Sequence, residues 1–297
     1  MSTDRKEQRV IKIGTRGSEL ALIQTNMAIA GLKEAYPDTL FEIVKITTKG
    51  DQNQKSPIYE FGGKAVFVED IEQAILSGTI DMAVHSAKDM PNPCKEGLVI
   101  AGVLERANPC DVLIYKKDRL IDKKNPFVIG TSSLRRQCQI KEIYPNAICK
   151  DLRGNVGTRM EKLKNGEYDA IILAMAGITR KGLSMDETLS YLPFEPEQML
   201  PAAGQGIIAI EAKKDSPAHK MAATISHRKT QDVLEVERAV LSELSAGCHE
   251  PVGVYAIKTE DKIQIHLMKQ EKACVIRNCV VGAFEDRISL IKKLCNG

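Results

Sequence analysis

The sequence predicts an α/β protein with two doubly wound lobes followed by a small α+β domain. From about residue 10 to residue 180, short apolar runs of strand length alternate with amphipathic segments of helix length. Such alternation is typical of doubly wound α/β domains. After residue 250, three strand-like runs precede a closing helix. A chain of 297 residues is long enough for two or three separate cores.

The first lobe is expected to contain residues 1–106 and 201–225. Its predicted strands are apolar runs at 10–15, 41–47, 80–84, 98–104 and 207–211. One helix begins near Glu19 with Ser18 as its N-cap, another opens at Lys64 and ends at Gly78, and a short one follows Ser216. The intervening stretch is polar and rich in turn residues, which predicts a mobile loop at 48–64.

The second lobe is expected to span 107–200, with its boundary near the turn signal Asn108-Pro109. Its predicted strands are 111–115, 128–129, 149–152 and 170–174, and its helices end near Tyr144 and Lys164. The small domain is expected at 226–297. It should hold an amphipathic helix at 230–245, three antiparallel strands at 254–257, 262–268 and 274–281, and a helix that ends near Cys295.

One candidate site follows the apolar run at 80–84, where the chain changes abruptly to His85, Ser86, Lys88 and Asp89. Ligands of open α/β sheets bind at the carboxyl ends of strands, where side chains leave the core. An acid and a base side by side at such an exit indicate a site, although many strands also end in solvated polar residues.

A second candidate site is the Gly-Thr-Ser-Ser turn at 130–133, which offers hydroxyl and backbone N–H groups at the start of a helix. This arrangement favours anions. Arginines in the first helical turn oppose the helix dipole, which costs about 0.3–1 kcal/mol each. Five arginines lie near strand-to-helix junctions of this lobe: Arg135, Arg136, Arg153, Arg159 and Arg180. They are either solvated or share a polyanionic ligand, and their common position favours the ligand. Arg16, before the first helix, raises the same alternatives.

The eight cysteines form no CxxC pair and no zinc-binding pattern, so we expect reduced thiols and no metal. Most lie in apolar runs and are expected in cores, whereas Cys248 lies beside His249 on a loop and is either an exposed bystander or functional. The amino terminus has no signal-peptide core, and no apolar run is long enough to cross a membrane. We therefore expect a cytoplasmic protein that does not bind membranes.

Three classes of function can be compared with these sequence features. Aromatic residues make up only 4% of the chain and the net charge is +3, which disfavours a nucleic-acid binder. A non-catalytic bilobal protein that clamps an anion would use the arginines but neither Asp89 nor Cys248. An enzyme that acts on a polycarboxylate or phosphate would use all of these features.

Six ordered motifs resemble those of the porphobilinogen deaminase (hydroxymethylbilane synthase) family. They are GTRGSELA from Gly14, VHSAKDMP from Val84, GTSSLRR from Gly130, LRGNVGTR from Leu152, PAAGQG from Pro201 and GCHEPVG from Gly247. The resemblance runs from about Val10 to the carboxyl terminus. It implies two lobes like those of periplasmic binding proteins and a small domain that carries a cofactor.

The resemblance also implies a reaction. The family condenses four porphobilinogen molecules head to tail, releases ammonia each time and yields the linear tetrapyrrole hydroxymethylbilane. The chain grows on a dipyrromethane cofactor held by a thioether to a loop cysteine, which matches Cys248. Each porphobilinogen carries an acetate and a propionate, and arginine forks suit carboxylates. No nucleotide or metal is implied, and we expect a monomer.

Residue roles follow from the same resemblance. Asp89 matches the catalytic aspartate, and His85 is expected to be structural. The residues expected to bind the cofactor are Ser18, Ser86, Lys88, Thr131, Ser133, Arg135, Arg136 and Arg159. Those expected to bind substrate are Arg16, Gln24, Lys64, Phe67, Arg153, Arg159, Arg180 and Gln205. The 48–64 loop departs from the family pattern, because Glu60 stands where a basic residue is usual.

Overall fold

The computed structural model describes residues 10–48, 68–119, 121–183, 186–246, 250–272 and 274–296. The chain divides into two compact units, each built from two separate stretches. The first unit is Met1–Glu105 with Ile207–Gln231, and the second is Arg106–Gly206 with Asp232–Gly297. The division into three domains at 1–106 with 201–225, 107–200 and 226–297 stays a prediction.

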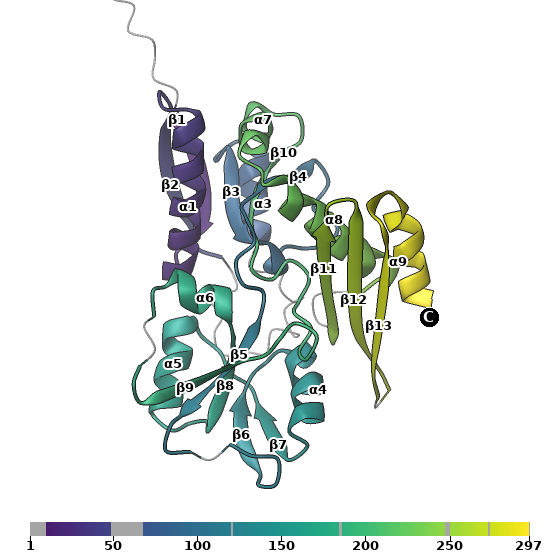
Figure 1. Ribbon diagram of the computed structural model, residues 1–297. Helices are drawn as coiled ribbons and strands as arrows, with labels where there is room; N and C mark the ends of the chain where they lie inside the picture. Colours follow the sequence, from purple (N-terminus) through teal and green to yellow (C-terminus); the bar gives the residue numbers. More distant parts are fainter. Residues whose placement is uncertain are drawn as a thin grey trace, which may run out of the picture. The chain divides into compact units, whose positions relative to one another are not determined.

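The first unit contains a five-stranded sheet with the order β2-β1-β3-β10-β4 (Figure 1). Strands β1, β2 and β3 run parallel, whereas β10 is antiparallel to both of its neighbours. The strands are β1 (Val10–Arg16), β2 (Leu40–Ile46), β3 (Met82–Ser86), β4 (Leu98–Val103) and β10 (Ile208–Lys213). This mixed sheet confirms the predicted α/β class for the first lobe.

Helices cover both faces of this sheet. Buried residues of α1 (Glu19–Ala35) and α7 (Pro217–Thr224) pack with one set of strand side chains, which includes Ile13 and Ile210. On the other face, α3 (Glu69–Leu76) packs through Ile71 and Ile75 against Ala83 and Leu98. The sheet is therefore buried on both sides, as doubly wound sheets are.

Strand β3 differs from its prediction. The run at 80–84 was expected to be the strand, but β3 is Met82–Ser86 and includes both His85 and Ser86. Ile80 is buried under α3 and forms part of the turn after that helix. His85 and Ser86 pair with Ala209 and Ile208 of β10. Pairing with a distant strand extends β3 past the end of its apolar run.

The second unit contains a sheet of the same design, with the order β7-β6-β8-β5-β9 (Figure 1). Strands β6, β7 and β8 are parallel, and β5 is antiparallel to both of its neighbours. The strands are β5 (Asp111–Lys116), β6 (Phe127–Gly130), β7 (Ala147–Lys150), β8 (Ala170–Ala174) and β9 (Leu189–Pro193). The helices are α4 (Leu134–Ile143), α5 (Val156–Lys164) and α6 (Met175–Arg180).

Two strands of this sheet differ from prediction. The strand expected at 149–152 lies at Ala147–Lys150, because its register is set by pairing with Phe127–Gly130. Strand β9 was not predicted. It is an edge strand that ends at Pro193, and an edge position tolerates a residue without a backbone N–H.

The second unit also contains the small α+β fold that was predicted. Its antiparallel sheet has the order β11-β12-β13, with β11 (Val252–Thr259), β12 (Lys262–Glu271) and β13 (Cys274–Ala283). One face packs on α8 (Arg228–Glu243) and α9 (Arg287–Asn296), through residues such as Val236, Ile265 and Leu294. The short 3-10 helix η4 (Phe284–Asp286) joins β13 to α9.

The cysteines in the described part of the chain carry free thiols. Cys110 is buried as expected, but Cys274 and Cys279 are exposed. The expected core placement is therefore wrong for these two, because β13 is an edge strand whose residues alternate between partly buried and exposed positions.

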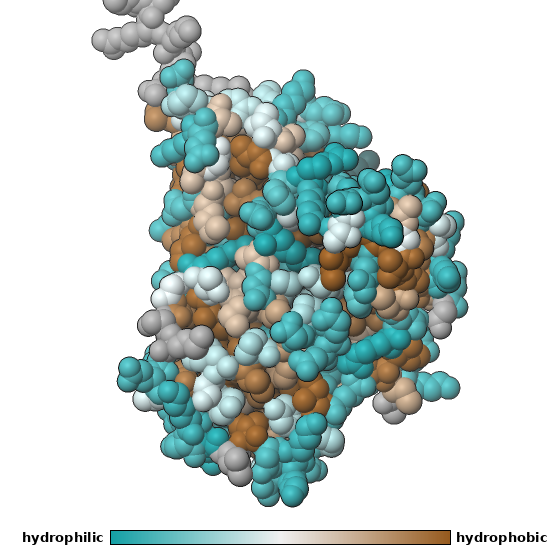
Figure 2. All heavy atoms as spheres, in the orientation of Figure 1, coloured by the Kyte–Doolittle hydropathy of each residue, from teal (hydrophilic) through white to brown (hydrophobic). Residues whose placement is uncertain are grey.

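Polar and apolar side chains are interspersed on the face drawn in Figure 2, as on most globular proteins. Within the described ranges, no helix combines the length and the apolar character that a membrane span requires.

Candidate active site

The carboxyl ends of β1 and β3 lie at one edge of the first sheet. The two strands are parallel neighbours, with Gly14 opposite Ala83. Arg16 ends β1, and Ser86 ends β3. The 3-10 helix η3 (Ala87–Asp89) follows directly and carries Lys88 and Asp89. Lys88 and Asp89 thus lie directly after the carboxyl end of a buried strand, whereas His85 and Ser86, which were also expected after it, lie within it.

Side chains at this edge contact one another. Ser18 is the N-cap of α1, and its Oγ accepts a hydrogen bond from the backbone N–H of Ala21 at 3.3 Å. Gln24, on the same helix, donates from Nε2 to Ser86 Oγ at 2.8 Å. Gln24 is only 4% exposed. Both Gln24 and Ser86 were expected to contact ligands, and in this structure they join α1 to the end of β3.

The second sheet gathers its candidate residues in the same way. Strands β6, β7 and β8 are parallel, so the segments that follow them lie at one edge. These segments hold the turn at 130–133, Arg153, and the helix α6 that ends at Arg180. Arg159 lies on α5, where its Nε donates to the carbonyl of Gly154 at 2.8 Å.

Within the turn, the serine hydroxyls differ in their contacts. Ser132 Oγ lies 3.1 Å from the carbonyl oxygen and 3.0 Å from the backbone nitrogen of Leu152, which joins this turn to the end of β7. Thr131 Oγ1 accepts from the backbone N–H of Ser133 at 3.3 Å. Ser133 is the N-cap of α4, but its side chain makes no capping hydrogen bond.

Asp111, on β5, pairs with both arginines at the start of α4. Its Oδ2 lies 2.8 Å from Arg135 Nη2, and its Oδ1 lies 2.7 Å from Arg136 Nη2. All three residues are buried. Burial lowers the pKa of Arg135, and the charge of Asp111 opposes that shift. The anion that compensates these two arginines in the structure is therefore a side chain of the protein.

Backbone carbonyls complete the surroundings of both guanidinium groups. Arg135 Nη1 donates to the carbonyl of Leu200 at 2.6 Å, and Arg136 Nη1 donates to that of Ile172 at 2.9 Å. The Nε of Arg136 is buried without a hydrogen-bond partner among the described residues. Two positive charges thus share the carboxylate of Asp111.

Arg180 forms no ion pair with a carboxylate of the described residues. Its Nη2 donates to the carbonyl of Gly206 at 2.6 Å, and its buried Nε has no hydrogen-bond partner among the described residues. Burial lowers the pKa of Arg180. A partly buried cation of this kind is costly unless an anion joins it.

Gln205 lies in the same cluster. Its Nε2 donates to Asp111 Oδ1 at 2.9 Å and to the carbonyl of Pro109 at 2.6 Å. The side chain was expected to contact substrate, but it is buried against Asp111.

Sequence reasoning missed Asp111 and a second buried acid, Glu237 of α8. Glu237 Oε1 lies 2.6 Å from Arg106 Nη1, and its Oε2 accepts from the backbone N–H of Gly204 at 2.7 Å. The available signal was an acidic residue within or beside an apolar run, because such a residue is rarely buried unless it is paired.

Three predicted site residues lie outside the described residues, namely Lys64, Phe67 and Cys248, as does the loop at 48–64 beyond Thr48.

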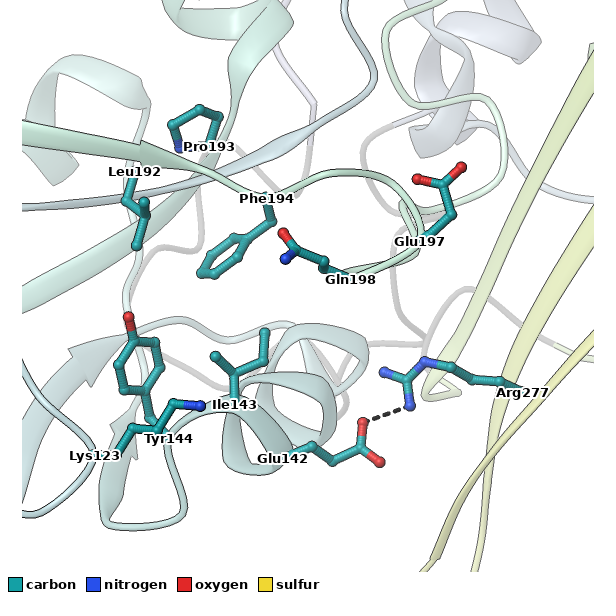
Figure 3. A pocket seen from close by; sticks show the side chains of 10 residues that line it. All are labelled: Lys123, Glu142, Ile143, Tyr144, Leu192, Pro193, Phe194, Glu197, Gln198 and Arg277. Atoms are coloured by element: carbon teal, nitrogen blue, oxygen red, sulfur yellow. Dashed lines mark ion pairs between the residues drawn. The ribbon is translucent and has the colours of Figure 1, made fainter.

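A pocket of about 600 Å³ lies in the second unit between the end of α4, the segment after β9 and β13. Figure 3 shows Tyr144, Phe194 and Ile143 around it, with an ion pair of 2.6 Å between Arg277 Nη1 and Glu142 Oε2 at one side. None of the predicted site residues lines this pocket. The pocket is therefore not part of the predicted site.

Comparison with known proteins connects both units to one family. Residues 11–223 match the family described as "Porphobilinogen deaminase, dipyromethane cofactor binding domain". Residues 233–295 match "Porphobilinogen deaminase, C-terminal domain". The chain also has a weaker likeness to a solved structure, the periplasmic VFT2 domain of Bordetella pertussis BvgS. The TM-score is 0.45 at 15% identity, over 73% of this chain and 86% of that one.

Curated relatives agree over most of their length. The porphobilinogen deaminase of Streptococcus sanguinis is 41% identical over 90% of this chain and 89% of that protein. The porphobilinogen deaminase of Rickettsia prowazekii is 43% identical over 96% of this chain and 95% of that protein. The probable porphobilinogen deaminase of Archaeoglobus fulgidus is 45% identical over 82% of each chain. These matches favour the enzyme over a non-catalytic anion-binding protein. The chain belongs to the porphobilinogen deaminase family, enzymes that condense four porphobilinogen molecules into hydroxymethylbilane on a covalently bound dipyrromethane.

Proposed function

We propose that the chain carries out this condensation with Asp89 as its catalytic carboxylate and Cys248 as the residue that holds the dipyrromethane through a thioether. The position of Asp89 supports the first assignment, because η3 projects from the carboxyl end of a buried strand in a doubly wound sheet. Its match to the family motif VHSAKDMP supports the same role.

The reaction requires a group that stabilises a positively charged intermediate. When ammonia leaves porphobilinogen, the C–N bond breaks and a cationic azafulvene remains. A carbon–carbon bond then forms to the terminal ring of the growing chain, and that ring loses a proton, which balances the proton carried off by the amine. A carboxylate beside the pyrrole N–H stabilises the cation and can move the proton. We assign this task to Asp89.

The observation that carries the anion-binding part of the proposal is the state of Arg180. Its guanidinium is half-buried, its Nε has no hydrogen-bond partner within the described residues, and its Nη2 donates to a neutral carbonyl. A carboxylate is the natural partner for such a group. Every ring of the substrate and product carries two carboxylates, so the residues present fit a polycarboxylate.

The dipyrromethane would supply a covalent primer with its own acetate and propionate groups, so its fit to the residues present can be judged in the same way. In the second unit, Arg135 and Arg136 share the carboxylate of Asp111, and Arg180 contacts a backbone carbonyl. These positive charges fit a cofactor that brings carboxylates. We assign cofactor contacts to Ser18, Ser86, Lys88, Thr131, Ser133, Arg135, Arg136 and Arg159, and substrate contacts to Arg16, Gln24, Lys64, Phe67, Arg153, Arg159, Arg180 and Gln205.

Contacts in the structure refine some of these roles. Gln24 and Ser86 bind each other, and Gln205 binds Asp111, so these three side chains would act by holding the site in shape. Arg180 is left as the strongest candidate for direct contact with a substrate carboxylate. We further propose that the protein acts as a cytoplasmic monomer without nucleic-acid or membrane partners, as its composition suggests.

Intact-mass measurement tests the cofactor assignment. The native protein should exceed its sequence mass by one dipyrromethane, and Cys248→Ser should show the bare sequence mass without activity. Cys295→Ser is the matched control and should keep the added mass. An active wild-type protein with no added mass, or a loaded Cys248→Ser variant, would contradict the assignment.

A further inference from the structure

Three titratable residues are buried together in the first unit and have no part in the reaction described above. His85 is 6% exposed, Glu72 4% and Glu211 0%. His85 Nε2 lies 3.2 Å from Glu211 Oε2. We refer to His85, Glu211 and Glu72 as the acid–histidine cluster.

The strand register explains why they meet. In the antiparallel pair of β3 and β10, His85 is opposite Ala209 and Glu211 is opposite Ala83. Since residues two apart share a face, His85 and Glu211 lie diagonally on the same face of the sheet. Ala83 on this face packs against α3, the helix that contributes Glu72.

Geometry pairs the basic and acidic members of the cluster. Neither carboxylate oxygen of Glu211 has a hydrogen-bond partner among the described residues, and His85 Nε2 is the basic group placed next to it, 3.2 Å from Oε2. Burial raises the pKa of Glu72, and the charge of Glu211 adds to the shift, while Lys95 and His85 oppose it and Glu69 adds to it. Glu72 is therefore coupled to the same buried pair.

This cluster is joined to the chain segment that carries Asp89. His85 precedes Ser86, which is held on the opposite face by Gln24 at 2.8 Å. The backbone N–H of Ala87 donates to the carbonyl of Ile207, just before β10, at 3.0 Å. The end of β3 is therefore held from both faces and along its edge, and η3 begins at the next residue.

We propose that the acid–histidine cluster is a positioning device, in which the buried contact between His85 and Glu211, packed beside Glu72 of α3, fixes the end of β3 and so sets the placement of Lys88 and Asp89. The inference rests on the proposed catalytic role of Asp89. None of the three residues is a catalytic residue itself, because they act through the turn that follows β3.

The test compares kcat and KM of Glu211→Gln with those of the wild type, with cofactor loading checked by intact mass. The variant should load the cofactor and keep a KM close to that of the wild type. Its kcat should fall about 10- to 100-fold, the scale expected for a misplaced catalytic group. Glu211→Asp retains the carboxylate and should recover part of the lost kcat.

A double variant tests whether His85 and Glu211 act as a pair. If they do, His85→Asn combined with Glu211→Gln should lower kcat no more than about as much as either single variant does. Ile210→Val is the packing control, because Ile210 is the neighbour of Glu211 on the other face of β10 and belongs to the α1-side core. It should leave kcat and KM close to those of the wild type.

The outcomes separate this inference from the proposed function. Wild-type kcat in Glu211→Gln would overturn the positioning role, and so would independent, additive losses of kcat in the two single variants. If neither Glu211→Gln nor His85→Asn folds, the cluster serves stability and the inference is wrong. Normal turnover by Asp89→Asn would instead refute the proposed function.

Discussion

Asp111 and Arg136 form a buried ion pair, with Asp111 Oδ1 2.7 Å from Arg136 Nη2, inside a cluster that also holds a second arginine. Arg135 lies 2.8 Å from the other oxygen of the same carboxylate. One acid thus holds two neighbouring arginines at the start of α4, against the unfavourable direction of the helix dipole. Asp111 is therefore structurally important, although it lies outside all six family motifs.

Replacement of Asp111 by Asn should destabilise the protein strongly. Removal of one partner of a buried ion pair costs about 3–5 kcal/mol, because the remaining charge is buried without compensation. The free energy of unfolding in urea measures the loss. Arg119→Ala is the control, since Arg119 forms an exposed ion pair with Asp169, and such pairs contribute about 1 kcal/mol or less. Similar losses in both variants would contradict the role of Asp111.

Arg180→Gln should affect activity without the same loss of stability. A hydrogen-bonded pair with a charged group contributes about 1.5–3 kcal/mol, so kcat/KM for porphobilinogen should fall about 10- to 100-fold. The free energy of unfolding should change by no more than about 1 kcal/mol, since within the described part of the chain the variant loses the hydrogen bond to Gly206. Steady-state kinetics and urea unfolding of one preparation give both values. Strong destabilisation with unchanged kcat/KM would make Arg180 a structural residue.

Much of the fold could be predicted because its signals are local. Apolar runs marked most strands, and Ser18, Asn155 and Ser216 begin helices with the side-chain hydrogen bonds expected of N-caps. The errors occurred where a distant strand decides the outcome. β3 extends to Ser86 because β10 pairs with it, and no local pattern reports that pairing.

The candidate site was predictable to a similar degree. The position of Asp89 after a buried strand follows from an apolar run that ends in polar residues. The charge pairings were not predictable, because Asp111 reaches Arg135 and Arg136 only through the insertion of β5 beside β8. For the same reason, the sequence offered Gln24 and Gln205 as ligand-binding residues, although their amides are bound within the protein.

The stability of the protein should depend on the protonation of Glu72. Its pKa in the folded state is raised above the ordinary value of 4.5 by burial and by Glu211. Between these two values the folded protein binds more protons than the unfolded chain, so the free energy of unfolding decreases as the pH rises through this window. Glu72→Gln removes this contribution and should flatten the decrease.

Urea unfolding of Glu72→Gln and wild type from pH 4 to pH 8 measures this difference. Glu34→Gln, on the exposed surface of α1, controls for the loss of one carboxylate. A stability difference between Glu72→Gln and wild type that does not vary with pH would contradict the assignment.

The most direct test of the central claim is the turnover of Asp89→Asn, with folding and cofactor loading measured on the same sample. Asn keeps the size of the side chain but removes the negative charge that stabilises the cationic intermediate. Asp89→Glu is the matched variant, because it retains the charge and moves it by one methylene. We expect Asp89→Asn to fold and to carry the dipyrromethane mass, yet to lose nearly all formation of hydroxymethylbilane, while Asp89→Glu retains measurable activity. Near-normal turnover of a folded, loaded Asp89→Asn protein would contradict the account.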